Sequence, residues 1–135
     1  YACDGLTLEI TYNGRSSVIN VEIADTHVAR QKGLMFRESL GMNSGMLFIY
    51  EDPRLVNFWM KNTSIPLDIA FADKKGKVVQ IYKNTKPFSL DLIAGGEKIQ
   101  YVLEVNAGMS EKFLLFEGAK LNYTNFKKKS SDNCS

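Results

Sequence analysis

The sequence has few of the residues that enzymes use for nucleophilic or metal chemistry. Its 135 residues include one histidine and two cysteines, and no Gly-x-Ser-x-Gly segment is present to form a nucleophile elbow. A Ser–His–Asp triad would have to use His27, which lies at the start of an expected helix. One histidine and two terminal cysteines do not make a usual zinc site. We therefore expect no metal, no cofactor and no nucleophilic catalysis.

Long apolar runs and a strong charge imbalance are also missing. No segment approaches the roughly 20 apolar residues that a membrane-spanning helix needs. The 17 basic and 15 acidic residues leave a net charge of +2, which is too small to favour nucleic acid as a partner. The apolar fraction of 44% can form one core. We expect a single β-rich domain over residues 1–126 and a polar, basic, disordered tail over 127–135.

The two cysteines, Cys3 and Cys134, lie near opposite ends of the chain. The ends of a domain often lie close together, so these residues could form a disulfide. Two unbridged thiols, or a lipid-bearing Cys3, are the alternatives. Disulfides persist outside the cytosol, and a chain that begins at Tyr1 fits either a removed signal peptide or a trimmed sequence. We expect an extracytoplasmic protein, periplasmic or secreted.

Alternation of apolar and polar residues dominates the first third of the chain. It predicts strands over Leu6–Tyr12 and Ile19–Ile23. Asn13-Gly14 between them favours a tight hairpin turn, because both central residues of that turn need positive φ. A short helix follows over Asp25–Gly33, with Asp25 or Thr26 as its cap and Gly33 as its stop.

Further strand-like runs follow at short spacing, with turn residues between them. They are Met46–Tyr50, Val56–Met60, Leu67–Ala72, Lys77–Lys83, Ile99–Val105 and Ala119–Thr124. A second helical turn is expected over Met109–Leu114. Short, half-buried strands predict a mainly β domain, an antiparallel sandwich or barrel with one or two short helices.

Residues 21–108 contain four segments that resemble an uncharacterised prokaryotic family, domain of unknown function 192. They are Gly33–Leu40 (GLMFRESL), Gly45–Phe48 (GMLF), Phe58–Phe71 (FWMKNTSIPLDIAF) and Tyr101–Gly108 (YVLEVNAG). The resemblance implies a mainly β, sandwich-like fold and frequent export. It implies no established activity, cofactor or catalytic residue. Met109 stands where the family usually has an aromatic residue, so an aromatic role there is not carried over.

The third of these segments is the best place to look for a binding site. If Phe58 and Met60 face the core, alternation places Trp59 and Lys61 on the other side of the strand. An exposed tryptophan beside polar side chains can form a binding platform. Alternatively, the loop around Arg37 covers Trp59 and the polar residues only cap loops. The candidate binding residues are Arg37, Trp59, Lys61, Asn62, Asp68, Glu104 and Asn106.

Asp68 and Glu104 form the second candidate group, because alternation directs both away from the core. If their strands are neighbours, Arg37 or Lys61 between them would complete an ion-pair network. The other interpretation is a pair of catalytic carboxyls for acid–base hydrolysis, which must lie about 5–10 Å apart in one cleft.

Three functions therefore remain open from the sequence. The first is a non-enzymatic binding module of the cell envelope for a small polar ligand, a glycan or a peptide. The second is a structural or assembly domain with an architectural polar network. The third is a hydrolase that uses Asp68 and Glu104. What separates them is whether Trp59, Asp68, Glu104 and Arg37 share one open concave site.

Overall fold

The structure of the chain is a computed structural model that describes residues 6–128, and only the backbone of residues 123–128. The predicted Cys3–Cys134 disulfide and residues 129–135 of the predicted tail lie outside the described residues. The elements are β1 (Leu6–Tyr12), β2 (Arg15–Ala24), α1 (His27–Lys32), β3 (Ser44–Phe58), β4 (Leu67–Ala72), β5 (Val78–Tyr82), β6 (Ile93–Asn106) and β7 (Lys120–Lys128). The strand β7 therefore extends two residues into the segment that we assigned to the tail.

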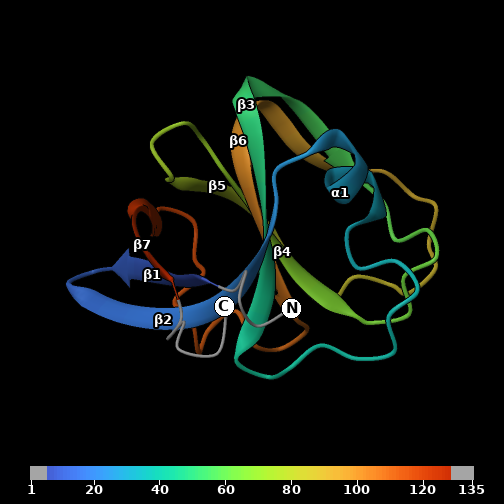
Figure 1. The fold of residues 1–135 in the computed structure, drawn as a ribbon, viewed down its shortest axis with the longest axis horizontal. Helices are drawn as coiled ribbons and strands as arrows, with labels where there is room; N and C mark the ends of the chain where they lie inside the picture. The colour runs from blue at the N-terminus through green and yellow to red at the C-terminus, as the bar shows by residue number, and fades with distance from the viewer. Residues whose placement is uncertain (1–5, 129–135) are drawn as a thin grey trace.

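The seven strands form one curled sheet in the order β5-β4-β6-β3-β2-β1-β7 (Figure 1). All neighbouring pairs are antiparallel except β2 and β3, which run parallel. A parallel pair needs a crossover connection rather than a hairpin, and the segment that contains α1 provides it. The expectation of a single, mainly β domain is confirmed, whereas the sheet is mixed rather than purely antiparallel.

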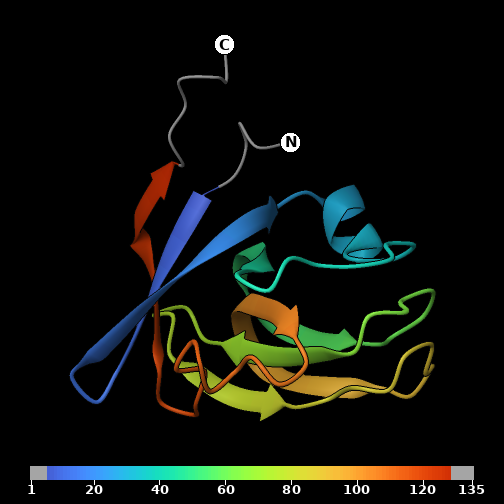
Figure 2. The same cartoon turned by 90° about the horizontal axis from the view of Figure 1, so that it is seen from below.

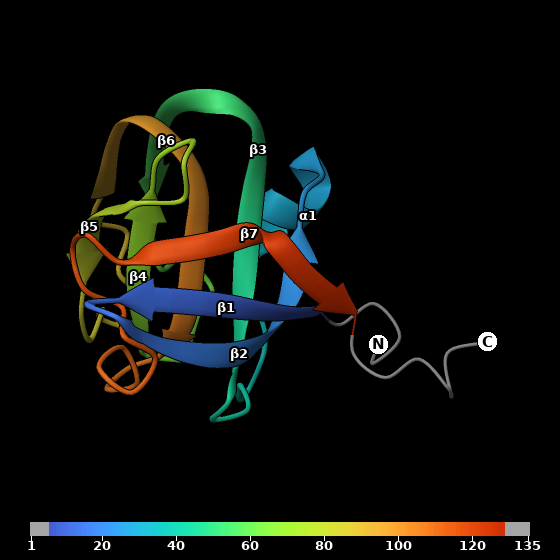
Figure 3. The same ribbon diagram turned by 90° about the vertical axis from the view of Figure 1, so that its left-hand side faces the viewer.

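The two outer strands of the sheet meet at one end and turn it into a half-barrel (Figure 3). Lys77 and Lys120 form a β-bridge. Beside it, the Leu121 N–H donates to the Gly76 carbonyl at 2.7 Å. Gly76 has φ +82°, and a Cβ there would lie 2.3 Å from the Leu121 carbonyl oxygen. Only glycine permits this close approach of the two chains.

The local predictions at the N-terminal end are confirmed. Asn13 and Gly14 both have positive φ, 52° and 74°, and the turn pairs Tyr12 with Arg15. The helix α1 begins after Thr26, whose side chain accepts from the Ala29 N–H at 3.1 Å. No residue of α1 is buried.

The two strands predicted over Met46–Tyr50 and Val56–Met60 are one continuous strand, β3, that bends where we expected a turn. The β3–β6 register shifts between Ile49 and Arg54, and both halves of β3 pair with β6. Figure 3 shows β3 arching over at this bend with β6 beside it. The irregular register adds curvature without ending the strand.

Apolar side chains pack on both faces of the central strands, in two separate cores. The first core includes Leu8, Ile10, Ile19, Leu47, Leu103 and Leu115. The second core includes Leu34, Phe48, Met60, Ile69, Phe71 and Val102. All six residues of β4 are buried as a result. The sequence pattern predicted one buried face for this strand, the face of Leu67, Ile69 and Phe71 that packs in the second core. The first core covers the other face, which carries Ala70 and Ala72 and which we expected to be exposed.

The segment after β6 forms turns rather than the second helix that we considered over Met109–Leu114. Within residues 6–128, no helix is long and apolar enough to cross a membrane.

Candidate functional site

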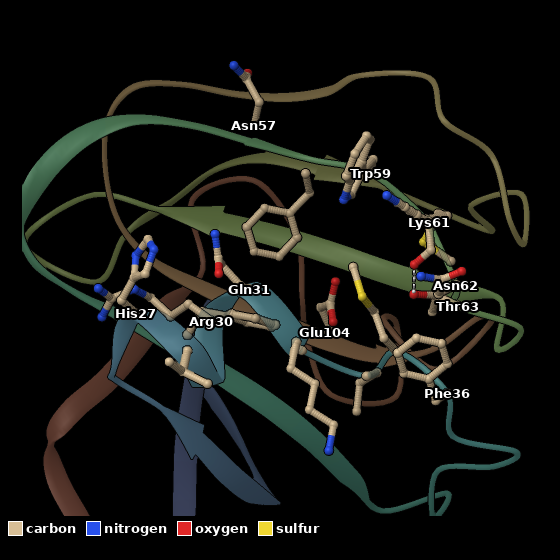
Figure 4. A pocket seen from close by; sticks show the side chains of 18 of the residues that line it. His27, Arg30, Gln31, Phe36, Asn57, Trp59, Lys61, Asn62, Thr63 and Glu104 are labelled. Atoms are coloured by element: carbon tan, nitrogen blue, oxygen red, sulfur yellow. Dashed lines mark hydrogen bonds between the residues drawn. The ribbon is translucent and has the colours of Figure 1, made fainter.

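An open cavity of about 740 Å³ lies between α1, the bent strand β3 and the loop that follows it (Figure 4). This volume falls in the range of small-molecule sites, about 300–1,000 Å³. The walls that matter most for chemistry come from α1 (Arg30, Gln31), β3 (Phe48, Tyr50, Phe58) and β6 (Glu104). The second core closes the cavity from below.

Hydrogen bonds between loops fix the rim of the cavity. The Phe36 N–H donates to the Asn62 carbonyl at 2.8 Å, and the Phe88 N–H donates to the Thr63 carbonyl at 3.0 Å. Figure 2 shows these three loops at the same end of the molecule, away from the termini. Asn62 turns the chain with φ 55°, a conformation that asparagine tolerates well.

Two exposed aromatic side chains flank the opening of the cavity. Trp59 is 47% exposed and Phe36 is 74% exposed. Lys61 extends over the Trp59 ring, with its Nζ 5.1 Å from the ring centre. The structure therefore places Trp59 at the mouth of a cavity and does not bury it beneath the Arg37 loop. Phe36 also has φ 67°, which costs a residue with a bulky side chain of the order of 1 kcal/mol.

Glu104 lies at the floor of the cavity and is 5% exposed. Figure 4 shows its carboxyl between Gln31 of α1 and the loop that carries Asn62 and Thr63. Among the side chains of residues 6–122 and the backbone of residues 6–128, no group donates a hydrogen bond to this carboxyl. Burial raises its pKa from 4.5 to about 8. At neutral pH the group is therefore mostly protonated and can both donate and accept a hydrogen bond.

Tyr50 forms a second polar feature of the wall, between two guanidinium groups. The Arg30 and Arg54 Cζ atoms lie 4.9 and 5.3 Å from the ring centre. Burial raises the pKa of Tyr50, and the two arginines lower it in part. Arg30 also donates to the Ile49 carbonyl at 2.8 Å, and both arginines pair with Glu51. The positive charge on this wall is thus already engaged, and it does not reach Glu104.

Asp68, a predicted site residue, has a structural role instead. It is 1% exposed. Its Oδ1 accepts from the Asn84 N–H at 2.8 Å, and its Oδ2 accepts from the Gly108 and Ser110 N–H groups at 3.1 Å each. The carboxylate therefore ties β4 to two loops that would otherwise leave buried donors unpaired.

Asp68 and Glu104 lie on opposite faces of the sheet. Asp68 pairs in register with Val105, and Ile69 pairs with Glu104. Because successive side chains of a strand point to opposite faces, the two carboxyls are separated by the sheet itself. This arrangement lacks the shared cleft that the hydrolase hypothesis requires. It also corrects the expectation that both groups point away from the interior, since each is buried in a different layer.

Arg37 and Asn106 do not join the cavity either. Arg37 forms a two-pronged ion pair with Glu22, at 2.5 and 2.8 Å, so it does not complete a network with Asp68 or Glu104. The Asn106 Nδ2 donates to the Leu40 and Gly41 carbonyls at 2.7 and 3.1 Å and fixes the loop after α1. Of the predicted set, the structure brings Trp59, Lys61, Asn62 and Glu104 together.

Several cavity residues had no signal in the alternation pattern. Arg30 and Gln31 come from a short helix that buries nothing, and Tyr50 lies just before the bend of β3. Phe36 stands inside the first of the family-like segments, which could have marked it as a candidate. In the part of the chain that the structure describes, no three His, Cys, Asp or Glu side chains gather as they would around a metal ion.

Comparisons with other proteins give a family and several similar solved structures, of which two are described here. The DUF192 family model, described as "Uncharacterized ACR", matches residues 8–123. A protein from Sinorhizobium meliloti 1021, described as a candidate transcription regulator, is 36% identical with a TM-score of 0.82, over 87% of this chain and 92% of that chain. A protein of unknown function from Novosphingobium aromaticivorans DSM 12444 is 33% identical with a TM-score of 0.81, over 87% of this chain and 84% of that chain. No curated protein matches.

Proposed function

We propose that this chain, which belongs to the uncharacterised DUF192 family, is a non-enzymatic binding protein that holds one small ligand in the cavity beneath α1. The observation that carries the proposal is the open cavity of about 740 Å³ with two exposed aromatic side chains at its mouth. A preformed cavity with apolar walls and a few polar groups is the usual form of a small-molecule site.

The surface around the mouth supports this proposal energetically. Phe36 and Trp59 leave apolar area in water, and a ligand that covered them would gain roughly 25 cal/mol for each Å². The loops that carry them are hydrogen-bonded to the rest of the rim, so less conformational freedom is lost on binding. The backbone of Phe36 is held at positive φ, and such strain is common at ligand sites.

Chemistry on the bound ligand has less support than binding. The cavity contains one carboxyl, Glu104, and the second carboxyl that hydrolysis would need is on the other face of the sheet. The structural interactions of Asp68 favour an architectural polar network as well, but this network stabilises the fold and does not line the cavity. The architectural network and the binding function are therefore compatible.

Nucleic-acid binding, which the description of the Sinorhizobium protein could suggest, is not part of the proposal. The net charge of +2 provides no strong electrostatic attraction for phosphates. A labelled DNA duplex titrated with the protein at low salt should show no change in anisotropy at micromolar concentration.

Trp59, the single tryptophan of the sequence, makes the proposal directly testable. We would titrate the protein with panels of glycans, short peptides and amphiphilic small molecules and follow tryptophan emission and the melting temperature. A true ligand should change both, and should protect Trp59 from acrylamide quenching.

A cavity-narrowing variant supplies the control. Gln31 is exposed on α1 and its side chain lines the cavity, so Gln31→Phe should weaken binding at least about tenfold by taking up ligand space. Val18 is 59% exposed on β2 and does not line the cavity, so Val18→Phe should bind normally. Equal binding by both variants, or no ligand in any panel, would contradict the proposal.

We also propose that the protein works outside the cytoplasm. The pair Cys3 and Cys134 and the family resemblance support this location. Cell fractionation of the full-length protein tests it, together with the mass of the purified chain before and after reduction. A cytoplasmic protein with two reduced thiols would refute it.

A further inference from the structure

Glu104 is an isolated acid among several cationic side chains. The cavity is lined by Arg30 and Lys32 from α1, Arg54 from β3, and Lys61 from the following loop. Within residues 6–128, none of these forms an ion pair with Glu104. Arg30 and Arg54 instead pair with Glu51, and Lys61 extends over Trp59. A buried carboxyl that is open to a cavity and lacks a partner suggests that a ligand supplies one.

We propose that the cavity binds a small organic cation, an amine with an apolar body, whose ammonium group pairs with the Glu104 carboxylate. This inference rests on the proposed binding function and specifies the class of ligand. The apolar body would lie against Phe58 and the exposed ring of Trp59, and the ammonium would reach the floor.

The walls of the cavity are suited to a cation with an apolar body. Phe48 and Phe58 pack edge to face, with ring centres 4.9 Å apart, and both line the cavity. Aromatic faces attract cations when water is excluded. The protein already uses this attraction at the same site, since Arg30 and Arg54 lie over Tyr50.

Other ligand charges fit less well. An anion would place a second negative or acidic group beside Glu104 and would itself have to be desolvated. A neutral ligand could hydrogen-bond to the protonated carboxyl, but would leave the largest available electrostatic gain unused. Lys32 and Lys61 are exposed at the rim, so salt screens their repulsion of an incoming cation.

Binding of a cation should release a proton. The protonated carboxyl and the ammonium ion combine to give a carboxylate–ammonium pair, and the carboxyl proton goes to the solvent. Burial raises the pKa of Glu104 to about 8, whereas an alkylammonium keeps its proton to about pH 10. The affinity for the amine should therefore fall roughly tenfold for each unit that the pH is lowered below 8, and should level off above it.

Other titratable and charged groups also face the cavity. From β3 these groups are Tyr50 and Arg54, from α1 they are His27, Arg30 and Lys32, and from the loop the group is Lys61. Asp68 on the neighbouring strand β4 belongs to the opposite face.

Calorimetry on the full chain with three matched probes tests the inference: phenethylamine, 2-phenylethanol and 3-phenylpropionate. We expect phenethylamine to bind at least about tenfold tighter than the alcohol at pH 8, and the carboxylate to bind weakest. Repeating the titration at pH 7 in buffers of different ionisation enthalpy should reveal release of about 0.9 proton for each amine bound, as a pKa of about 8 requires.

Glu104→Gln separates charge from shape, because the amide has nearly the same size. We expect the variant to bind amine and alcohol within about twofold of each other and to lose proton release. Glu117→Gln, an exposed position outside the cavity, should behave like the parent. If the alcohol matches the amine, if phenethylamine does not bind, or if Glu104→Gln keeps the preference, the cation assignment is wrong. If the cation assignment fails in this way but another ligand binds in the cavity, the proposed binding function still stands. If no ligand in any panel binds, both the cation assignment and the binding function are wrong.

Discussion

Replacing Glu104 with glutamine should change how the stability of the protein depends on pH. The folded state raises the pKa of this carboxyl from 4.5 to about 8, because the group is 5% exposed. Below pH 4.5 the group is protonated in both the folded and the unfolded chain, so its ionisation does not change the free energy of unfolding. Between pH 4.5 and 8 the unfolded chain gives up the proton while the folded chain keeps it, so stability falls as pH rises.

The size of this effect follows from the pKa difference. Each pH unit in the window from 4.5 to 8 costs about 1.4 kcal/mol. The loss reaches about 3 kcal/mol at pH 7 and about 5 kcal/mol above pH 8. Glutamine has no ionisable proton, so Glu104→Gln avoids this pH-dependent cost. The free energy of unfolding of the variant, relative to that of the parent, should therefore increase by the same amounts between pH 4.5 and pH 8. At pH 7 the change corresponds to roughly 10 °C in melting temperature.

Urea denaturation followed by Trp59 fluorescence, at pH 5, 6, 7 and 8, measures the effect. All other groups are the same in both proteins, so their contributions cancel in the difference between the two stabilities. Two parallel stability profiles would refute the reasoning, because they would mean that Glu104 keeps an ordinary pKa and is hydrated in the folded state. A parent protein that gains stability from pH 5 to 8 relative to the variant would reverse the sign and would require a cation beside Glu104.

Three further substitutions test the structural assignments by urea denaturation. Asp68→Asn should cost about 3 kcal/mol, since it removes a carboxylate that accepts from three backbone N–H groups; a loss under about 1 kcal/mol would contradict that role. Arg37→Ala should cost less than about 1 kcal/mol, because its pair with Glu22 is partly exposed; a larger loss would restore the predicted network. Gly95→Ala should cost about 1–3 kcal/mol, as its Cβ would lie 2.2 Å from the Phe71 ring; unchanged stability would mean that this ring can move.

The elements that depend on local chemistry were predictable from the sequence. The Asn13-Gly14 turn and the Thr26 cap work through neighbouring residues, so their signals lie within a few positions. The alternation in β4 correctly placed Leu67, Ile69 and Phe71 on one face. The pattern carries no information on strand direction, which explains why the parallel β2–β3 pair was not foreseen.

The site was only partly predictable, because it depends on register and on a second core. Alternation showed that Asp68 and Glu104 point away from the apolar residues of their own strands. It could not show that their strands pair one residue out of step, which puts the two carboxyls on opposite faces. Likewise, the segment around Glu51 looked like a turn between two strands, and only the pairing of both halves with β6 shows a bend. Residues on both sides of that bend, Tyr50 and Phe58, line the cavity.

The pairing of β1 with β7 joins the first and last strands of the fold, for example Ile10 with Leu121. Contacts between positions this distant in sequence form slowly, because a long loop must close before they give any stabilisation. During synthesis, β1 and β2 can form their hairpin early, but β7 leaves the ribosome after the other six strands. The nascent chain therefore stays incompletely folded until β7 has emerged, which leaves an interval in which chaperones can hold it.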